Sequence, residues 1–201
     1  FNEQSGNTLR DELTDIRPGS FLDTVSGSGS LGFRAKKNVN GTIISGFVTA
    51  NHVINSTQRN AYRGNTKIGE YYCGQNSGTI DASFVQYTST YSLTNITPSG
   101  DVLSTSWFTS IPEGTTVYLS GKTSPHAREG EVKSNSFSFY VASDGISYSD
   151  MIRSSYSSDN GDSGGVVYAS YGGVNCLVGI HQGICSIIYA ISNRAVCSKA
   201  S

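Results

Sequence analysis

The residues best suited to chemistry form the run Asn160-Gly161-Asp162-Ser163-Gly164-Gly165. A serine hydroxyl becomes a nucleophile when a neighbouring base removes its proton. Attack on a carbonyl also needs backbone N–H groups that face the developing oxyanion, and glycine before the serine allows this geometry because it has no Cβ. An ordinary tight turn into a strand is the other interpretation of the run. Five specified residues in order favour nucleophilic catalysis.

Two further residues complete a possible nucleophilic site. The run Phe47-Val48-Thr49-Ala50-Asn51-His52 ends an apolar strand on a histidine, although a lone histidine there is more often a surface or core residue. Asp81 comes just before the apolar pair Phe84-Val85, where aspartates commonly cap turns. The order His52, Asp81, Ser163, with intervals of 29 and 82 residues, is one of three chain orders found for the Ser-His-Asp triad. The spacing therefore predicts a serine hydrolase site.

Short strand-like runs between Gly, Ser, Asn and Pro residues must position these side chains. Val, Ile, Tyr and Phe are frequent in the runs and suit the half-buried surface of a sheet. The pattern predicts an all-β sandwich or barrel. The predicted strands are Ser30–Ala35, Thr42–Thr49, Ile68–Tyr72, Ala82–Tyr87, Thr115–Ser120, Ser136–Val141, Gly165–Tyr168, Cys176–Ile180 and Ser186–Ile191. Weak helical signals occur at Asp11–Ile16 and Ser192–Lys199.

The composition excludes several classes of protein. Charged residues make up only 14% of the 201 residues, and the formal net charge is −1. This balance argues against a nucleic-acid binder, which needs a basic surface. No run approaches the roughly 18 apolar residues of a membrane helix. An aromatic content of 10% excludes a disordered chain. We expect a compact, monomeric protein with neither nucleic acid nor membrane as a partner.

Several features favour a secreted protein. The chain begins at Phe1 and has no signal-peptide apolar region, so we expect a processed mature form. The four cysteines form no C-x-x-C pair, which disfavours a structural zinc site. Cys176, Cys185 and Cys197 lie near one another in sequence, so we expect a disulfide among them and Cys73 unpaired. The sequence leaves the pairing open.

The motifs together resemble the chymotrypsin-type serine proteases, and specifically the short bacterial branch of the streptogrisins and α-lytic protease. The resemblance covers most of residues 29–196. Asn51 replaces the usual Gly of the Thr-Ala-Gly-His motif, whereas the nucleophile motif is unchanged. The similar segments are Ser30-Leu31-Gly32-Phe33, Phe47–His52, Asp81 with Phe84-Val85, Gly161–Gly165, and the cleft strand Val178-Gly179-Ile180.

The resemblance implies two six-stranded antiparallel β-barrels with the active site in the cleft between them. Residues 1–28 form an N-terminal extension in this interpretation, and residues 29–100 form the first barrel. Residues 101–201 form the second barrel, which ends in a short C-terminal helix. The polar stretch Thr94–Asp101 is the predicted linker between the two halves.

The resemblance also implies a mechanism that acts on protein or peptide substrates without a metal or cofactor. Ser163 attacks the scissile carbonyl, His52 transfers the proton, and Asp81 orients the imidazole. The amides of Gly161 and Ser163 bind the oxyanion.

The residue before the nucleophile lacks the partner that relatives provide. Asp162 is expected to be buried, and a buried carboxylate needs a charged or hydrogen-bonding partner. Animal members supply the free amine of Ile-Val-Gly-Gly and bacterial members an internal Arg, but this chain has neither at the aligned positions. The sequence leaves Lys122, Arg128, Arg153 and the N-terminal segment as alternatives.

The specificity pocket resembles that of the glutamyl endopeptidases. Ser157 occupies the position of the trypsin-like Asp, so cleavage after Arg or Lys is not expected. His181 and Ser158 match that branch's pocket histidine and hydroxyl residue, and together they offer two donors to a substrate carboxylate. We expect Glu at P1, with Asp as a second choice. The predicted substrate site also includes Asn160, Gln182 and Gly183.

Two other interpretations stay open at this point. If His181 is only a satisfied core or cleft histidine, Ser157 and Ser158 imply a broad protease for small or aromatic P1 residues. A catalytically silent homologue that serves as a binding module is the other, because fold does not fix function. Its usual signature is the loss of a triad residue, and His52, Asp81 and Ser163 are all present.

Overall fold

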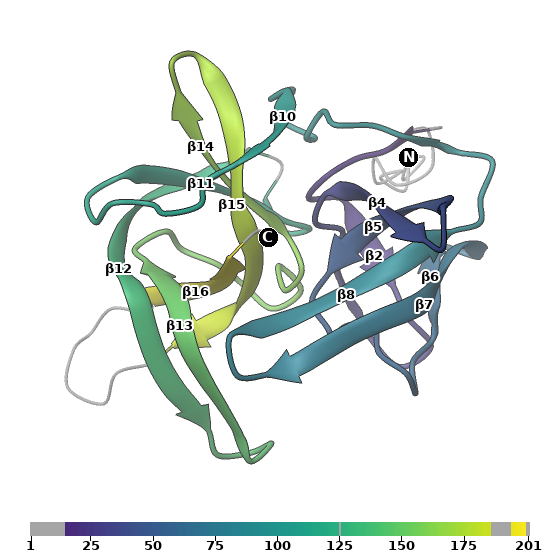
Figure 1. Cartoon of the computed structure of the whole chain (residues 1–201), viewed down its shortest axis with the longest axis horizontal. Coiled ribbons are helices and arrows are strands. Elements are labelled where there is room, and N and C mark those ends of the chain that lie inside the picture. The colour runs from purple at the N-terminus through teal and green to yellow at the C-terminus, as the bar shows by residue number, and fades with distance from the viewer. Residues whose placement is uncertain (1–14, 125, 186–193, 200–201) are drawn as a thin grey trace, which may run out of the picture.

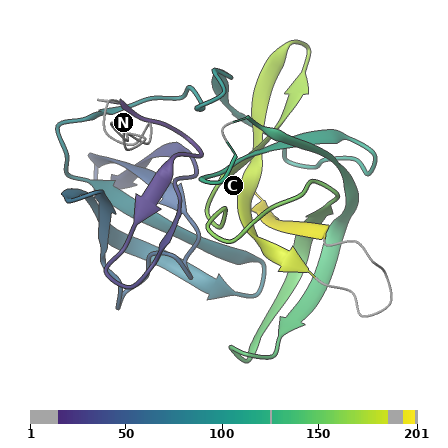
Figure 2. The same cartoon turned by 180° about the vertical axis from the view of Figure 1, so that it is seen from behind.

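The computed structural model describes residues 15–124, 126–185 and 194–199, and the regular structure among them consists of strands. Two curled sheets lie side by side, and a segment of chain crosses from one to the other (Figures 1 and 2). The predicted all-β fold class is confirmed. No helix in the described ranges has the length and hydrophobicity that a membrane crossing requires.

The first sheet contains seven strands in the order β3-β2-β6-β7-β8-β5-β4. Its strands are β2 (Phe21–Asp23), β3 (Ser28–Ser30), β4 (Arg34–Val39), β5 (Thr42–Thr49), β6 (Asn60–Arg63), β7 (Thr66–Ser77) and β8 (Ile80–Tyr87). Strand β2 comes from the segment that the sequence analysis separated as an extension. It pairs with β3 and, through Asp23 and Tyr62, with β6. This part of the N-terminal segment therefore belongs to the first sheet.

Strand β8 illustrates how the first sheet positions a site residue. Asp81, Ser83 and Val85 are its buried residues, and they alternate with less buried ones. Because alternate side chains of a strand face the same side, these three point into the sheet's interior. Val85 joins a core that includes Phe47 and Ile68. The alternation that buries Val85 also turns the carboxylate of Asp81 inward.

The second sheet also has seven strands, in the order β10-β15-β14-β11-β12-β13-β16. They are β10 (Leu103–Trp107), β11 (Thr116–Ser120), β12 (Arg128–Val141), β13 (Ile146–Ser154), β14 (Val166–Tyr171), β15 (Val174–Cys185) and β16 (Arg194–Lys199). Because β15 pairs with β16 as well as β14, six strands form a closed ring, while β10 attaches to β15 in parallel. The ring encloses a core that includes Leu119, Ile152 and Val178.

The predicted C-terminal helix is wrong. Residues 194–199 form strand β16, which pairs with β13 on one side and with β15 on the other. The backbone groups of these two neighbours need partners, and β16 supplies them. At the other end, β1 (Asp15–Ile16) pairs in parallel with β9 (Ser92–Leu93) rather than forming a helix. Residues 11–14 and the predicted strand at 186–191 lie outside the described residues.

Candidate active site

The end of β5 and the start of β8 bring the predicted base and acid together. Nδ1 of His52 lies 2.6 Å from Oδ2 of Asp81. The Asp81 side chain is fully buried, whereas that of His52 is 33% exposed. The other carboxylate oxygen accepts hydrogen bonds from the amides of Asn51 at 2.8 Å and His52 at 3.2 Å. These contacts fix the carboxylate and turn one imidazole nitrogen towards it, which leaves Nε2 for chemistry.

The Asn51 side chain stabilises the turn that carries His52. Its Nδ2 donates to Oγ of Ser83 at 2.7 Å, and that hydroxyl donates to the carbonyl of Ile54 at 2.6 Å. These two hydrogen bonds therefore link both sides of the turn, at Asn51 and Ile54, to Ser83 of β8. The sequence showed that Asn51 departs from the related motif but did not reveal Ser83 as its partner.

The electrostatic surroundings favour protonated His52. Burial of the ring lowers the pKa of His52, but the hydrogen bond and the charge of Asp81 outweigh this effect and raise the pKa above its ordinary value. The charge of Asp144, in the exposed turn between β12 and β13, adds to the rise. A base with this bias accepts a proton from a serine readily and forms a stabilised imidazolium.

The predicted nucleophile lies in the turn between β13 and β14, whose shape depends on glycine. Gly161 has a φ of 102° and Gly164 a φ of 86°, both in the left-handed region. A Cβ on Gly164 would lie 2.2 Å from Oγ1 of Thr49 and 2.4 Å from the carbonyl oxygen of Ser30. The turn therefore packs directly against the first sheet.

Several hydrogen bonds fasten this turn on both sides. The Ser30 amide donates to the carbonyl of Ser163 at 2.8 Å, and the Ser30 hydroxyl donates to the carbonyl of Gly161 at 2.8 Å. The Gly164 amide donates to the carbonyl of His181 at 2.7 Å. The amides of Gly161 and Ser163 donate to no other group among the described residues. Those two amides are the predicted oxyanion donors.

The Ser163 hydroxyl donates to the carbonyl of Gln182 at 3.2 Å. Sequence reasoning assigned Gln182 to the substrate site by its position and did not foresee this backbone contact. The contact places Ser163 next to β15, the strand that also carries His181.

Asp162 is fully buried, and Arg128 is its charged neighbour. Thr123 donates to it through its amide at 2.9 Å and its hydroxyl at 2.8 Å, and the Asp159 amide donates at 2.9 Å. The Arg128 guanidinium lies 3.8 Å away. Lys122 instead donates to Oγ of Ser28 at 2.5 Å. Among the described residues, Arg128 is therefore the charged partner of Asp162, and residues 1–14 of the N-terminal segment lie outside them.

The predicted specificity residues differ in burial. His181 is 1% exposed, and its Nδ1 lies 3.3 Å from the hydroxyl of Tyr156, a residue that sequence reasoning missed. The Ser158 hydroxyl oxygen is buried and has no hydrogen-bond partner among the described residues. Ser157 and Asn160 are exposed, and Gly183 is half-buried. A buried hydroxyl without a partner is able to donate to an incoming group.

The cysteines and acidic residues add no further chemistry in the described part of the chain. Cys73 and Cys176 are free thiols. Cys73 is therefore unpaired as expected, and Cys176 takes no part in the disulfide expected among Cys176, Cys185 and Cys197. The side chains of Cys185 and Cys197 lie outside the described structure. Among the described residues, no group of three or more His, Cys, Asp and Glu side chains could hold a metal ion.

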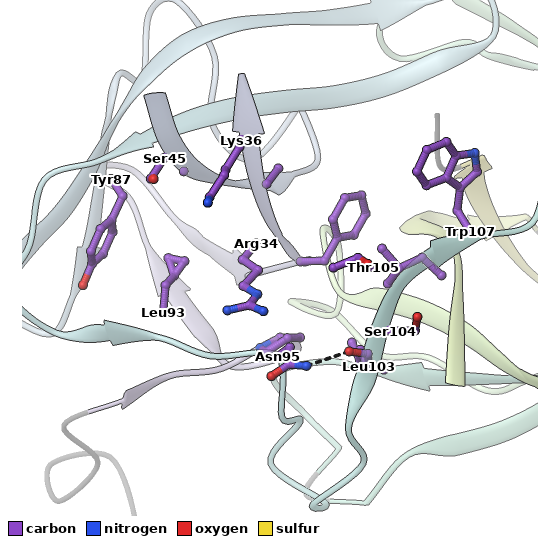
Figure 3. A pocket seen from close by; sticks show the side chains of 15 residues that line it. Arg34, Lys36, Ser45, Tyr87, Leu93, Asn95, Leu103, Ser104, Thr105 and Trp107 are labelled. Carbon is purple, nitrogen blue, oxygen red and sulfur yellow. Dashed lines mark hydrogen bonds between the residues drawn. The ribbon is translucent and has the colours of Figure 1, made fainter. Parts of the chain in front are cut away.

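A separate cavity lies away from these residues. It has a volume of about 530 Å³, and Phe33, Leu103, Trp107 and Leu177 contribute to its apolar lining (Figure 3). Arg34 is also part of the lining, and Figure 3 shows its guanidinium beside Leu93 and Asn95. None of the predicted site residues lines this cavity.

Solved structures with the same architecture are bacterial chymotrypsin-like serine proteases. A Nocardiopsis protease is 24% identical, with 92% of each chain covered and a TM-score of 0.72. The chymotrypsin of Cellulomonas bogoriensis is 23% identical, covering 92% of this chain and 91% of that one, with a TM-score of 0.67. A glutamic-acid-specific serine protease that uses a histidine triad in substrate binding is 24% identical. The match covers 92% of this chain and 93% of that one, with a TM-score of 0.68.

These likenesses establish the fold predicted from the sequence. The chain has the two-barrel fold of the bacterial chymotrypsin-like serine proteases. No protein-family profile matches the sequence, and no curated protein does either.

Proposed function

We propose that this chain with the chymotrypsin-like fold is a serine endopeptidase that prefers Glu, and secondarily Asp, at P1. The observation that carries the proposal is the 2.6 Å contact between His52 and the buried Asp81. The glycine turn around Ser163 supplies the nucleophile and the oxyanion donors. Among the described residues, the amides of Gly161 and Ser163 in this turn donate to no other group. Proteases among the solved structures of this fold support the same reaction class.

The proposed reaction uses these groups in the following order. When substrate enters, the Ser163 hydroxyl leaves the Gln182 carbonyl, gives its proton to Nε2 of His52, and bonds to the scissile carbon. Asp81 stabilises the imidazolium through Nδ1. The amides of Gly161 and Ser163 stabilise the oxyanion, each by roughly 3 kcal/mol in the transition state. His52 then protonates the leaving amine, and water hydrolyses the acyl-enzyme by the same steps in reverse.

The proposed Glu preference rests on His181 and Ser158. A buried hydroxyl without a partner and a buried imidazole both gain a hydrogen bond when a carboxylate arrives. One solved structure of the same fold is glutamic-acid-specific and uses a histidine triad. This chain has only three histidines, of which His52 is assigned to catalysis and His126 is exposed. Its pocket therefore combines one histidine with hydroxyl groups.

The first test is a digest of a proteome-derived peptide library, with Ser163→Ala as control. We expect cuts after Glu that disappear in the control. Cuts after small or aromatic residues would support the proposed protease activity but contradict the proposed Glu preference. Absence of cuts with wild-type protein would favour the silent homologue and contradict the proposal.

A second test separates the pocket from the triad. His181→Ala should reduce turnover of a P1-Glu peptide strongly while leaving an apolar P1 substrate little changed. An equal loss on both substrates would show that His181 supports the fold rather than specificity. Secretion and a monomeric state stay predictions.

A further inference from the structure

A long hairpin of the second sheet reaches across to the first sheet near Asp81. It consists of β12 and β13, and Figure 1 shows its lower half beside the end of the β7–β8 hairpin. Tyr148 forms an isolated parallel bridge with Gly78, the residue between β7 and β8. The Gly78 amide donates to the carbonyl of Ser147 at 3.1 Å, and the Ser149 amide donates to the carbonyl of Gly78 at 2.8 Å. The two sheets are therefore joined here by backbone hydrogen bonds.

The Tyr148 side chain extends this junction towards the catalytic groups. It is 4% exposed, and its hydroxyl donates to Oδ1 of Asn76. Asn76 lies directly opposite Asp81 in the β7–β8 register. The Tyr148 ring stacks on Phe139 with 5.0 Å between centroids, so its direction is fixed from within the hairpin.

The same hydroxyl also lies near groups from both halves of the site. Burial raises the pKa of Tyr148 to about 12, and the charge of Asp81 adds to the rise. The neighbouring Gln182 side chain acts in the opposite direction and partly offsets this rise in the pKa of Tyr148. Gln182 is the residue whose carbonyl accepts the Ser163 hydroxyl. Tyr148 thus lies close to strands β7 and β8, which carry Asn76 and Asp81, and near Gln182 of β15, the strand beside Ser163.

This position matters because the proposed triad is divided between the sheets. His52 and Asp81 come from the first sheet, whereas Ser163 belongs to the second. On the side of the nucleophile, Ser30 provides contacts between the two sheets. On the side of the acid, the contact runs through Gly78 and Tyr148. Two separated contacts fix the relative orientation of the two sheets, whereas a single contact would leave the sheets free to rotate about it.

We propose that Tyr148 is a positioning residue, which holds the strands of Asn76 and Asp81 against the β12–β13 hairpin of the second sheet so that base and nucleophile meet. The inference rests on the proposed protease activity and extends it to a residue outside the triad. Its hydroxyl contacts Asn76 on the strand beside Asp81 and would act through that strand. Its effect should therefore appear in the rate of the chemical step rather than in substrate binding.

Tyr148→Phe is the test, because it removes the hydroxyl and keeps the stacked ring. The matched control is Tyr140→Phe on the same hairpin, since that tyrosine is 62% exposed. With the best peptide p-nitroanilide from the library digest, we expect kcat to fall about tenfold with KM nearly unchanged. We expect no change in the control. A tenfold loss corresponds to a small misplacement of reacting groups.

Two further measurements distinguish positioning from a general loss of stability. Asn76→Ala should lower kcat similarly, and the double variant should be no worse than either single one, because both remove one hydrogen bond. In an NMR titration, the pKa of His52 should fall in Tyr148→Phe, because Asp81 is held less firmly against the ring. This readout does not depend on activity.

The outcomes separate this inference from the proposed function. Wild-type kcat and an unchanged His52 titration in Tyr148→Phe would overturn the role of Tyr148 while leaving the protease intact. A lower melting temperature without either change would show that the contact is only structural. If wild-type protein cleaves nothing, the proposed function fails, and the His52 titration alone decides whether Tyr148 positions Asp81.

Discussion

The Arg128 guanidinium lies 3.8 Å from the carboxylate of Asp162, which is fully buried one residue before the proposed nucleophile. Arg128 also donates to the Thr123 hydroxyl at 3.0 Å and to Asp159 at 2.7 Å. One side chain at the start of β12 thus pairs with both carboxylates of the turn that carries Ser163.

Replacing Arg128 by Met should lower the free energy of unfolding by about 2 kcal/mol. The loss should be less than the roughly 3–5 kcal/mol of a fully buried pair, because the hydrogen bonds from Thr123 and Asp159 remain. Urea denaturation measures the change. Lys133→Met is the control, since its contact with Glu131 is a surface one and should be worth less than about 0.5 kcal/mol. Equal effects of the two variants would contradict the role assigned to Arg128.

The acid side of the pH profile should depend on Asp144. His52 acts as a base only when neutral, so kcat/KM should rise as pH increases through its pKa. The charge of Asp144 raises that pKa. Asp144→Asn should therefore lower the pKa and move the acid limb to lower pH. The exposed Glu113→Gln is the control and should leave the limb in place. A shift of the acid limb to higher pH in Asp144→Asn would contradict the expected direction of the change in the pKa of His52.

A methyl group at Gly164 should be far more harmful than one at Gly172. Both residues have positive φ values, 86° and 58°, so alanine is strained at either position by about 1 kcal/mol. Only at Gly164 would the new Cβ meet other atoms, at 2.2 Å from Oγ1 of Thr49. We expect about 2–4 kcal/mol for Gly164→Ala. Chemical denaturation of both variants checks the difference, and similar losses would show that Thr49 simply moves aside.

Ser158→Ala should leave stability unchanged and weaken only the P1-Glu reaction. The hydroxyl has no partner among the described residues, so its removal breaks no bond in the free protein. A lost hydrogen bond to a carboxylate is worth about 1.5–3 kcal/mol, which is about ten- to hundredfold in kcat/KM. Ser154→Ala is the matched control, because its hydroxyl is equally buried and unpartnered in the described structure. A loss in both variants would contradict a pocket role for Ser158.

Local motifs made the fold and the catalytic candidates predictable. The glycine turn around Ser163 and the strand before His52 are contiguous in sequence, so their residue types reveal them. The sequence offered Arg128 only as one of four alternatives for the partner of Asp162, because Arg128 lies 34 positions earlier and meets it only through the register of β12. Tyr148 gave no signal for a similar reason. Its partners Asn76 and Gly78 lie about 70 positions earlier in the first sheet, and nothing in its sequence neighbours indicates them.

The ends of the chain show how tertiary pairing outweighs local preference. The run Ser192–Lys199 contains alanine and lysine and looks weakly helical, yet residues 194–199 are a strand between β13 and β15. Phe21–Asp23 and Ser28–Ser30 are too short to be recognised from alternation. Neighbouring strands define these elements, and a single sequence does not display its neighbours.

The place of β16 in the second barrel has a consequence for synthesis. The ring closes only when β16 pairs with β15, so the barrel that carries Ser163 is incomplete until residues 194–199 have emerged from the ribosome. Chains fold from the N-terminus as they are made, and the barrel with His52 and Asp81 is available first. The proposed site, which needs residues from both barrels, is therefore completed only late in synthesis.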